Sequence, residues 1–117
     1  MKKLTKEGII IPILNDEYKV IVCWGTPEKI KKAMKSWGHQ QQNVAGEVED
    51  RRGVCFYTKG CHPLIAMPRK PKTPTEIGTL THESVHAIEY IFDAISEPTR
   101  GELFAHSVGA VVRGALK

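Results

Sequence analysis

The residues most able to do chemistry lie in segment 81–87, which reads Thr-His-Glu-Ser-Val-His-Ala and contains the pattern His-Glu-x-x-His. His82 and His86 are four positions apart, so on a helix their imidazoles leave the same face one turn apart. Both rings can then reach one zinc ion at about 2.0–2.1 Å. Glu83 lies beside them, where a carboxylate can take a proton from a metal-bound water. The pattern therefore predicts a zinc-dependent hydrolase that acts on a peptide bond.

Sequence signals before and after this pattern place it inside one long helix. Thr73 is the expected N-cap, Pro74 occupies the first helical position and Glu76 is the capping-box partner. A mostly apolar stripe then follows helical spacing, and Pro98 stops the helix. The stripe consists of Ile77, Leu80, Ser84, Ile88, Ile91 and Ile95. Because the histidines lie on a different stripe, we expect this helix to bury one side and to present the metal ligands on another.

A catalytic zinc normally has three protein ligands and one open position. The downstream candidates for the third ligand are Asp93, Glu97, Glu102 and His106. Asp93 is on the same helix as the histidines and would have to turn back onto the ion. Glu102 begins a second amphipathic helix, expected from Thr99 to Leu116, whose first turn can approach the motif helix if the two are antiparallel. The spacing favours Glu102, although segment 99–102 also reads as a capping box, so a capping role for Glu102 stays open.

The pattern 82–86, followed by Glu-Leu-Phe-Ala at 102–105, resembles the gluzincin metallopeptidases, which carry a zinc-binding glutamate on the helix after the motif helix. The wider sequence from Gly78 to Ala105 looks like the small zincin-like proteins that phage and prophage genomes encode. The resemblance covers the C-terminal part of the chain well and the remainder only by general layout. It implies zinc as the cofactor and Glu83 as the general base. It also implies that the zinc ligands are His82, His86 and Glu102.

A hydrolase of this kind also needs a hydrogen-bond donor for the oxyanion. The sequence offers His106, Tyr90, Tyr57 and Arg100 and does not distinguish among them. His106 lies one helical turn after Glu102, where it can hydrogen-bond a zinc ligand or the oxyanion. We therefore name His106, with Glu83, as a candidate catalytic residue. The alternative is a histidine on the helix surface.

Local periodicity and turn residues predict an α+β fold for the whole chain. The expected elements are a strand over 18–24, a helix over 26–37, strands over 54–58 and 64–67, and the two C-terminal helices. The two short strands form a hairpin that turns at Lys59-Gly60, and the polar segment 39–53 is an exposed loop. This order suits a small twisted β-sheet packed against the active-site helix and further helices.

The layout resembles a minimal zincin-like domain that spans residues 1–117. Segment 64–67 is the expected sheet edge beside the motif helix, where an extended peptide can add as an extra strand. The alternative is an edge strand that binds nothing.

The composition is that of an ordinary globular domain, with 41% hydrophobic and 26% charged residues. No stretch of about 18 apolar residues is present, so we expect no membrane span. Three cysteines without a secretion signal indicate reduced thiols and a cytoplasmic location. The spacing of Cys55, Cys61 and His62 does not match a second metal site.

The net charge of +4 leaves a further interpretation open. Basic residues gather in segments 29–35 and 69–72, and a solvated basic face explains them. A basic nucleic-acid-binding protein is one alternative, and a non-catalytic, zinc-containing binding or assembly module is the other. The expected partner is a peptide or protein substrate, and the oligomeric state is not predicted.

Overall fold

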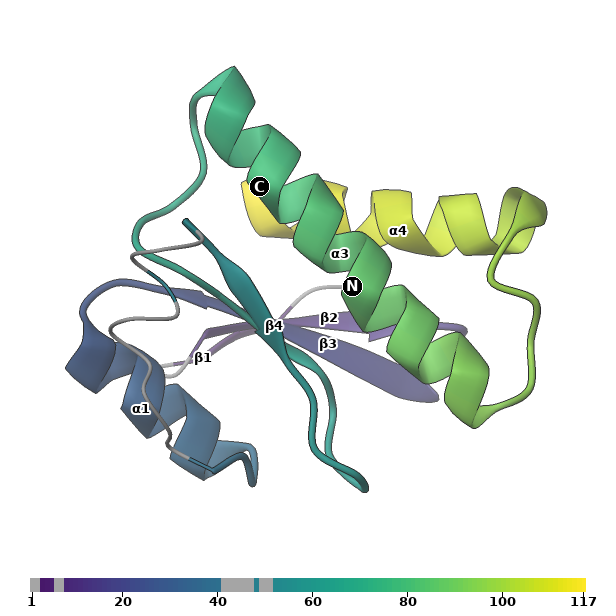
Figure 1. Cartoon of the computed structure of the whole chain (residues 1–117), viewed down its shortest axis with the longest axis horizontal. Helices are drawn as coiled ribbons and strands as arrows, with labels where there is room; N and C mark the ends of the chain where they lie inside the picture. Colours follow the sequence, from purple (N-terminus) through teal and green to yellow (C-terminus); the bar gives the residue numbers. More distant parts are fainter. Residues whose placement is uncertain (1–2, 6–7, 41–47, 49–51) are drawn as a thin grey trace.

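The computed structural model describes residues 3–5, 8–40, 48 and 52–117. The elements follow one another as β1 (Lys3–Thr5), β2 (Gly8–Ile13), β3 (Tyr18–Trp24), α1 (Pro27–Ser36), β4 (Val54–Phe56), β5 (Leu64–Met67), α3 (Pro74–Ala94) and α4 (Gly101–Leu116). Within the described residues, five strands form one sheet in the order β1-β2-β3-β5-β4. The β3–β5 pair is parallel and the other pairs are antiparallel. The predicted α+β fold, a sheet with packed helices, is confirmed (Figure 1).

The helices cover both faces of this sheet (Figure 1). Because strand side chains alternate between faces, β3 supplies Val20 and Val22 to one core and Ile21 and Cys23 to the other. The core under α3 and α4 consists of Ile9, Ile11, Ile13, Val20, Val22, Ile65, Met67, Leu80, Ala87, Ile88, Ile91, Phe92, Val111 and Ala115. The core under α1 consists of Ile21, Cys23, Ile30, Ala33, Met34, Val48, Val54, Leu64 and Ala66. α3 is thus held by apolar burial along the side opposite its histidines.

Several predicted elements are confirmed. β3 has the predicted bounds, and α1 begins after its N-cap Thr26, whose side chain accepts a hydrogen bond from the Lys29 amide. β4 and β5 pair as the predicted hairpin, although β4 ends at Phe56. Most of the predicted exposed loop 39–53 lies outside the described residues, but His39, Val48 and Gly53 are buried, so the prediction of exposure is wrong at these positions. Among the described residues, no helix combines the length and apolarity needed to cross a membrane.

The predicted position of segment 64–67 at the sheet edge is wrong. β5 lies between β3 and β4, and all four of its residues are buried. A continuous apolar run is typical of a strand that is covered on both faces, and Leu-Ile-Ala-Met is such a run. The edge strand beside α3 is therefore β4.

The sequence analysis also missed the two N-terminal strands, because Pro12 interrupts the apolar run after Gly8. Pro12 nevertheless pairs with Lys19 near the end of β2. In the described residues, β1 pairs with β2 only as far as Ile10. At Pro12, β2 is therefore paired with β3 alone. A proline is tolerated at such a position because no described partner strand needs its missing amide hydrogen.

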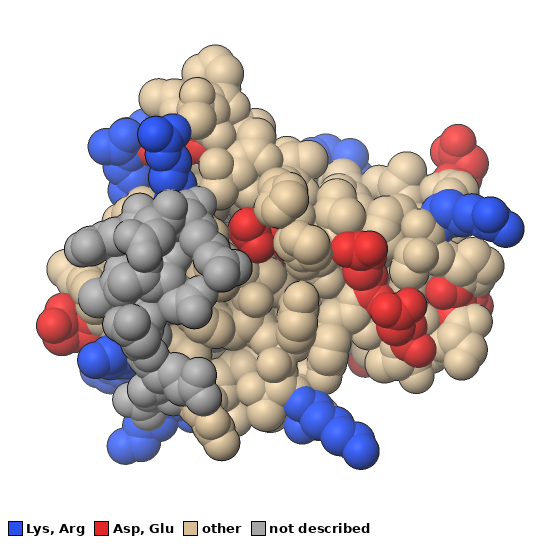
Figure 2. Space-filling view, in the orientation of Figure 1, with Lys and Arg blue, Asp and Glu red and all other residues tan. Residues whose placement is uncertain are grey.

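Charged side chains are unevenly distributed on the face shown in Figure 2. Lysine and arginine gather mostly over α1 and the connection that enters α3, whereas aspartate and glutamate gather mostly over the end of α3 and the start of α4. A region with few charged side chains separates the two. The net positive charge is thus not spread over this face as one basic surface.

Candidate functional site

The two histidines of the motif lie together on the side of α3 that borders β4. His82 Nε2 and His86 Nε2 are 3.2 Å apart, and the rings meet edge to face. Two nitrogens bound to one tetrahedral zinc at about 2.0–2.1 Å are separated by about 3.3–3.4 Å. The observed spacing therefore fits a pair of ligands to one ion.

Glu89 lies against the other nitrogen of His86. Its Oε1 is 3.3 Å from His86 Nδ1. A carboxylate in this position favours the tautomer with a hydrogen on Nδ1, which leaves the lone pair of Nε2 available to a metal. The sequence analysis gave Glu89 no role. Its spacing of three residues after the second histidine is the signal that could have identified it.

Glu83 is the one buried carboxylate among the described residues, with 9% of its surface exposed. His82 Nε2 lies 4.0 Å from Glu83 Oε2. That distance is too long for a hydrogen bond. No buried side-chain oxygen of the described residues lacks a hydrogen-bond partner, so the Glu83 carboxylate reaches solvent through its small exposed fraction.

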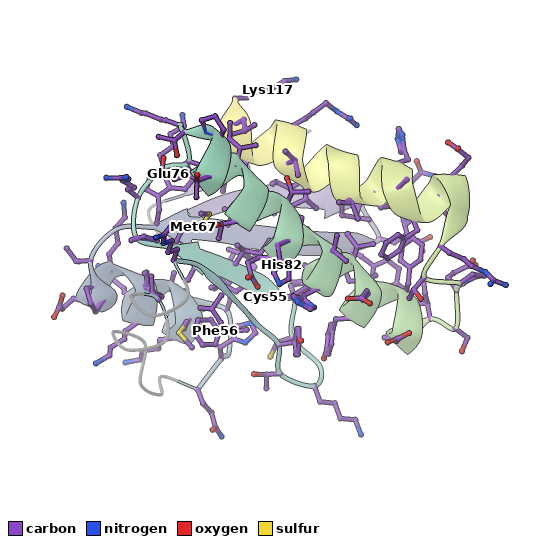
Figure 3. The ribbon with its side chains drawn as sticks, turned by 45° about the horizontal axis from the view of Figure 1, so that its top comes forward. Cys55, Phe56, Met67, Glu76, His82 and Lys117 are labelled. Atoms are coloured by element: carbon purple, nitrogen blue, oxygen red, sulfur yellow. The ribbon has the colours of Figure 1, made fainter. Side chains whose placement is uncertain are left out.

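A groove of about 650 Å³ runs between α3 and β4 and connects these residues. We call it the α3–β4 groove. It is lined by Thr75, Gly78, Thr79, His82, Glu83 and His86 from α3, and by Val54, Cys55 and Tyr57 from β4 and the turn that follows it. Cys55 and His82 lie close together on facing elements in Figure 3.

Tyr57 enters the groove on a supported segment. Its ring stacks on Tyr90 of α3, with centroids 4.9 Å apart and planes 5° from parallel. Tyr90 Oη donates a hydrogen bond to the Thr58 carbonyl at 3.0 Å, and the buried His39 bonds Thr58 Oγ1 through Nδ1 at 3.1 Å. These contacts hold Tyr57 beside the two histidines. Burial, followed by the nearby Cys55, Glu89 and Glu83, raises the pKa of Tyr57, so its hydroxyl stays protonated.

Cys55 is a groove residue that the sequence analysis did not assign to the motif. Burial raises the pKa of its thiol well above the usual range, and the Glu83 carboxylate adds to this shift. Cys61 lies elsewhere, where its thiol donates to the Gly38 carbonyl at 3.6 Å. The position of Cys55 depends on which strand forms the sheet edge, so no local pattern could reveal it.

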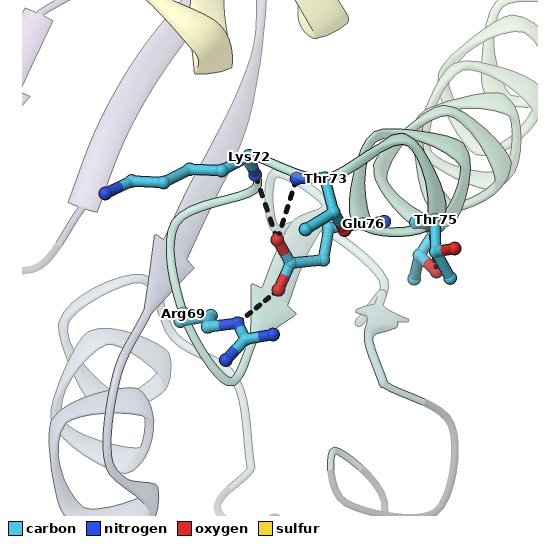
Figure 4. Close-up of polar contacts among 6 residues, drawn as sticks. Arg69, Lys72, Thr73, Thr75 and Glu76 are labelled. Carbon is cyan, nitrogen blue, oxygen red and sulfur yellow. Dashed lines mark hydrogen bonds and ion pairs between the residues drawn. The ribbon is translucent and has the colours of Figure 1, made fainter.

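Other contacts anchor the start of α3 as the sequence predicts. Thr73 Oγ1 accepts a hydrogen bond from the Glu76 amide at 3.1 Å, and the Glu76 carboxylate accepts from the Thr73 and Lys72 amides at 3.0 Å each. Arg69 donates to the same carboxylate (Figure 4). The hydrogen bond from the Thr73 amide, then those from Arg69 and Lys72, lower the pKa of Glu76 to about 2. The capping box is confirmed, and it fixes the turn that precedes the groove.

The structure does not bring Glu102 or His106 into the α3–β4 groove. Glu102 is exposed in the first turn of α4, and His106 lines a separate hollow between α4 and the β2–β3 turn. Among the described residues, no three His, Cys, Asp or Glu side chains are arranged to hold a metal ion. Glu102 as a zinc ligand and His106 as a catalytic residue stay predictions.

The alternative role of Glu102 as a helix cap is wrong. α4 begins at Gly101 with Arg100 as N-cap, and no side chain caps it. Because Arg100 is the N-cap, Thr99 lies one position before the cap and Glu102 occupies the second helical position, so the two residues do not form a capping box.

Comparisons with protein-family models, with curated proteins and with solved structures find no match to this chain. A functional assignment therefore depends on the chemistry of the groove.

Proposed function

We propose that this chain is a zinc-dependent metallopeptidase, with His82 and His86 as zinc ligands and Glu83 as the general base. The observation that carries the proposal is the arrangement of these three side chains. The Glu83 carboxylate lines the same groove as two imidazole nitrogens that are 3.2 Å apart, at the distance expected for two ligands of one ion.

Residues in and beside the groove then have distinct tasks. Zinc bound by the histidines supplies an activated water and polarises the substrate carbonyl. Glu83 accepts a proton and later passes it to the leaving amine. Glu89 keeps Nε2 of His86 free of hydrogen. Tyr57 is the oxyanion donor in this proposal, because His106 and Arg100 do not line the groove and the Tyr90 hydroxyl already donates to Thr58.

The third zinc ligand in this proposal is Glu102, and that part rests on the resemblance alone. Its carboxylate is exposed and is not engaged in capping α4. It would have to approach His86 for the site to be completed.

A peptide is the substrate that this groove supports best. Among the described residues β4 pairs with β5 alone, and in this proposal its other edge pairs with an extended chain. The exposed face in Figure 2 carries charges of both signs, which does not favour a polyanion such as DNA. We also propose a cytoplasmic location, because all three cysteines are free thiols.

Metal content and hydrolysis test the proposal together. We expect the purified protein to bind one zinc and to cleave unfolded casein in a reaction that a chelator stops. Glu83→Gln should keep the zinc and lose roughly 100-fold or more in kcat, because it removes the proton acceptor. His86→Ala should lose the zinc itself. A Glu83→Gln protein that digests casein at the wild-type rate would contradict the role of Glu83.

A further inference from the structure

Two neighbouring parallel strands of the sheet lead to helices on opposite faces. β3 continues into α1, which covers one core, and its parallel partner β5 continues into α3, which covers the other (Figure 1). The two connections therefore diverge from the same edge of the sheet, at the carboxyl ends of both strands. Such a switch point leaves a crevice between the connections, and open sheets with parallel strands bind their ligands there.

A cavity of about 610 Å³ lies at this edge of the sheet. We call it the switch-point cavity. It is lined by Met67, Pro68 and Arg69 at and after the end of β5, by Thr73, Thr75, Glu76 and Thr79 at the start of α3, and by Arg52 before β4. Its volume is within the range of about 300–1,000 Å³ that is typical of ligand sites. Its place in the fold and its size thus indicate a binding site by an argument that does not use the zinc motif.

The charged groups of the switch-point cavity favour an anion. Glu76, the one carboxylate among its described lining residues, already accepts from two amides and from Arg69. Arg69 uses Nε in that contact (Figure 4), which leaves its two terminal nitrogens without an acceptor in the described residues. Arg52 is exposed and forms no hydrogen bond or ion pair within the described part of the chain. The cavity thus offers guanidinium donors in the fork that a carboxylate matches.

The switch-point cavity adjoins the α3–β4 groove along α3, because Thr75 and Thr79 line both. Glu76, which Arg69 contacts, precedes His82 by six positions in the same helix. Six positions correspond to about 9 Å at a helical rise of 1.5 Å per residue. An extended chain covers that length with about three residues. A polypeptide in the groove can therefore place a side chain in the cavity while its main chain lies beside the histidines.

We infer that the switch-point cavity binds an acidic side chain of the substrate, and that Arg52 and Arg69 recognise its carboxylate. This inference rests on the proposed function and names the substrate class, which is a polypeptide with Asp or Glu about three residues from the cleaved bond. The cavity selects the acid over the amide of the same shape, because hydrogen bonds between two charged groups are roughly twice as strong as neutral ones.

Binding of two matched peptides tests the inference. The probes are fluorescein-labelled decapeptides, one of alternating Ala and Glu and one of alternating Ala and Gln. The parent is Glu83→Gln protein with equimolar zinc, so that the probes are not cleaved. Arg52→Gln and Arg69→Gln are added to this parent, and Arg113→Gln is the matched control, at an exposed arginine of α4 outside the cavity. Anisotropy gives each Kd, and urea unfolding gives each midpoint.

We expect the parent to bind the Ala-Glu peptide at least about tenfold more tightly than the Ala-Gln peptide. Arg52→Gln and Arg69→Gln should each weaken Ala-Glu binding by about tenfold, because each removes a charge-assisted hydrogen bond. Arg113→Gln should bind both peptides like the parent. Both cavity arginines are exposed, and an exposed ion pair contributes little stability, so the urea midpoints should stay close to that of the parent.

Equal affinity of the parent for the two peptides would overturn the inference, even if the wild-type protein is an active peptidase. A preference for Ala-Glu that survives in Arg52→Gln and Arg69→Gln, or that Arg113→Gln loses to the same extent, would also overturn it. If Arg69→Gln lowers the urea midpoint, Arg52→Gln alone decides, since Arg52 has no described partner to lose.

A second competitor distinguishes carboxylates from phosphates. A decamer of thymidylate that displaces the Ala-Glu peptide from the parent at equal or lower concentration would assign the arginines to a nucleic acid and overturn the inference. An arginine-dependent preference for Ala-Glu, in a protein whose wild type hydrolyses nothing, would support the acidic-side-chain site and overturn the peptidase proposal.

Discussion

The first turns of α3 and α4 satisfy their backbone amides in different ways. At the start of α3, Thr73 and Glu76 cap each other, and Arg69 holds the Glu76 carboxylate from the preceding connection. At the start of α4, Gly101 adopts a left-handed φ of 88°, Arg100 becomes the N-cap and no side chain bonds the free amides. A helix start without such a cap is less stable by about 1 kcal/mol.

This difference distinguishes α3, which carries the motif residues, from the first turn of α4, which carries Glu102. α3 holds His82, Glu83 and His86 in a set arrangement before any ligand arrives, because capping and apolar burial fix it along its length. The first turn of α4 carries Glu102 on the surface, free of a local role. If hydrolysis uses groups of α3 and β4 alone, substitutions in α4 should change neither kcat nor zinc affinity.

The largest expected effect comes from the oxyanion donor. Tyr57→Phe removes one hydroxyl from the groove and keeps the ring that stacks on Tyr90. We expect kcat for casein hydrolysis to fall by roughly 100-fold, as is typical when one oxyanion donor is lost. His106→Ala, on the α4 side, should change kcat little. The reverse order of effects would assign the donor to His106, one of the four candidates that the sequence offers.

A smaller effect is expected on metal affinity. If Glu102 completes the zinc site, Glu102→Gln should weaken zinc binding at least about tenfold, since even residues that only support a ligand contribute roughly 10–100-fold. Competition with a chromogenic chelator measures this, and Glu28→Gln, at an exposed carboxylate of α1, is the control. Wild-type affinity in Glu102→Gln would show that α4 is not part of the site and would make Cys55 the next ligand to test.

The smallest expected effect concerns the helix starts themselves. Thr73→Ala removes the side chain that accepts from the Glu76 amide, so the free energy of unfolding should fall by about 1 kcal/mol. Thr99→Ala removes no cap and should change it by less than about 0.5 kcal/mol. Urea denaturation of both variants gives the comparison. Equal losses would mean that Thr99 caps α4 in solution.

Local patterns in the sequence predict much of the fold. The bounds of β3, the cap of α1, the β4–β5 hairpin and the start of α3 depend on contacts within a few residues, and each was predicted correctly. The spacing of His82 and His86 likewise determines that both imidazoles leave one side of a helix. These features follow from periodicity and capping, which a short segment contains in full.

The tertiary structure decides what surrounds that pair. The order of the strands makes β4 the sheet edge and places Cys55 and Tyr57 opposite the histidines, although they precede them by more than two dozen positions in the chain. α4 begins at Gly101, which has a left-handed φ, and not at Thr99 as predicted. The capping box expected over segment 99–102 is therefore not formed. The neighbours of the groove depend on long-range packing, because they are determined by which strands pair and where helices cross, and no short stretch of sequence contains that information.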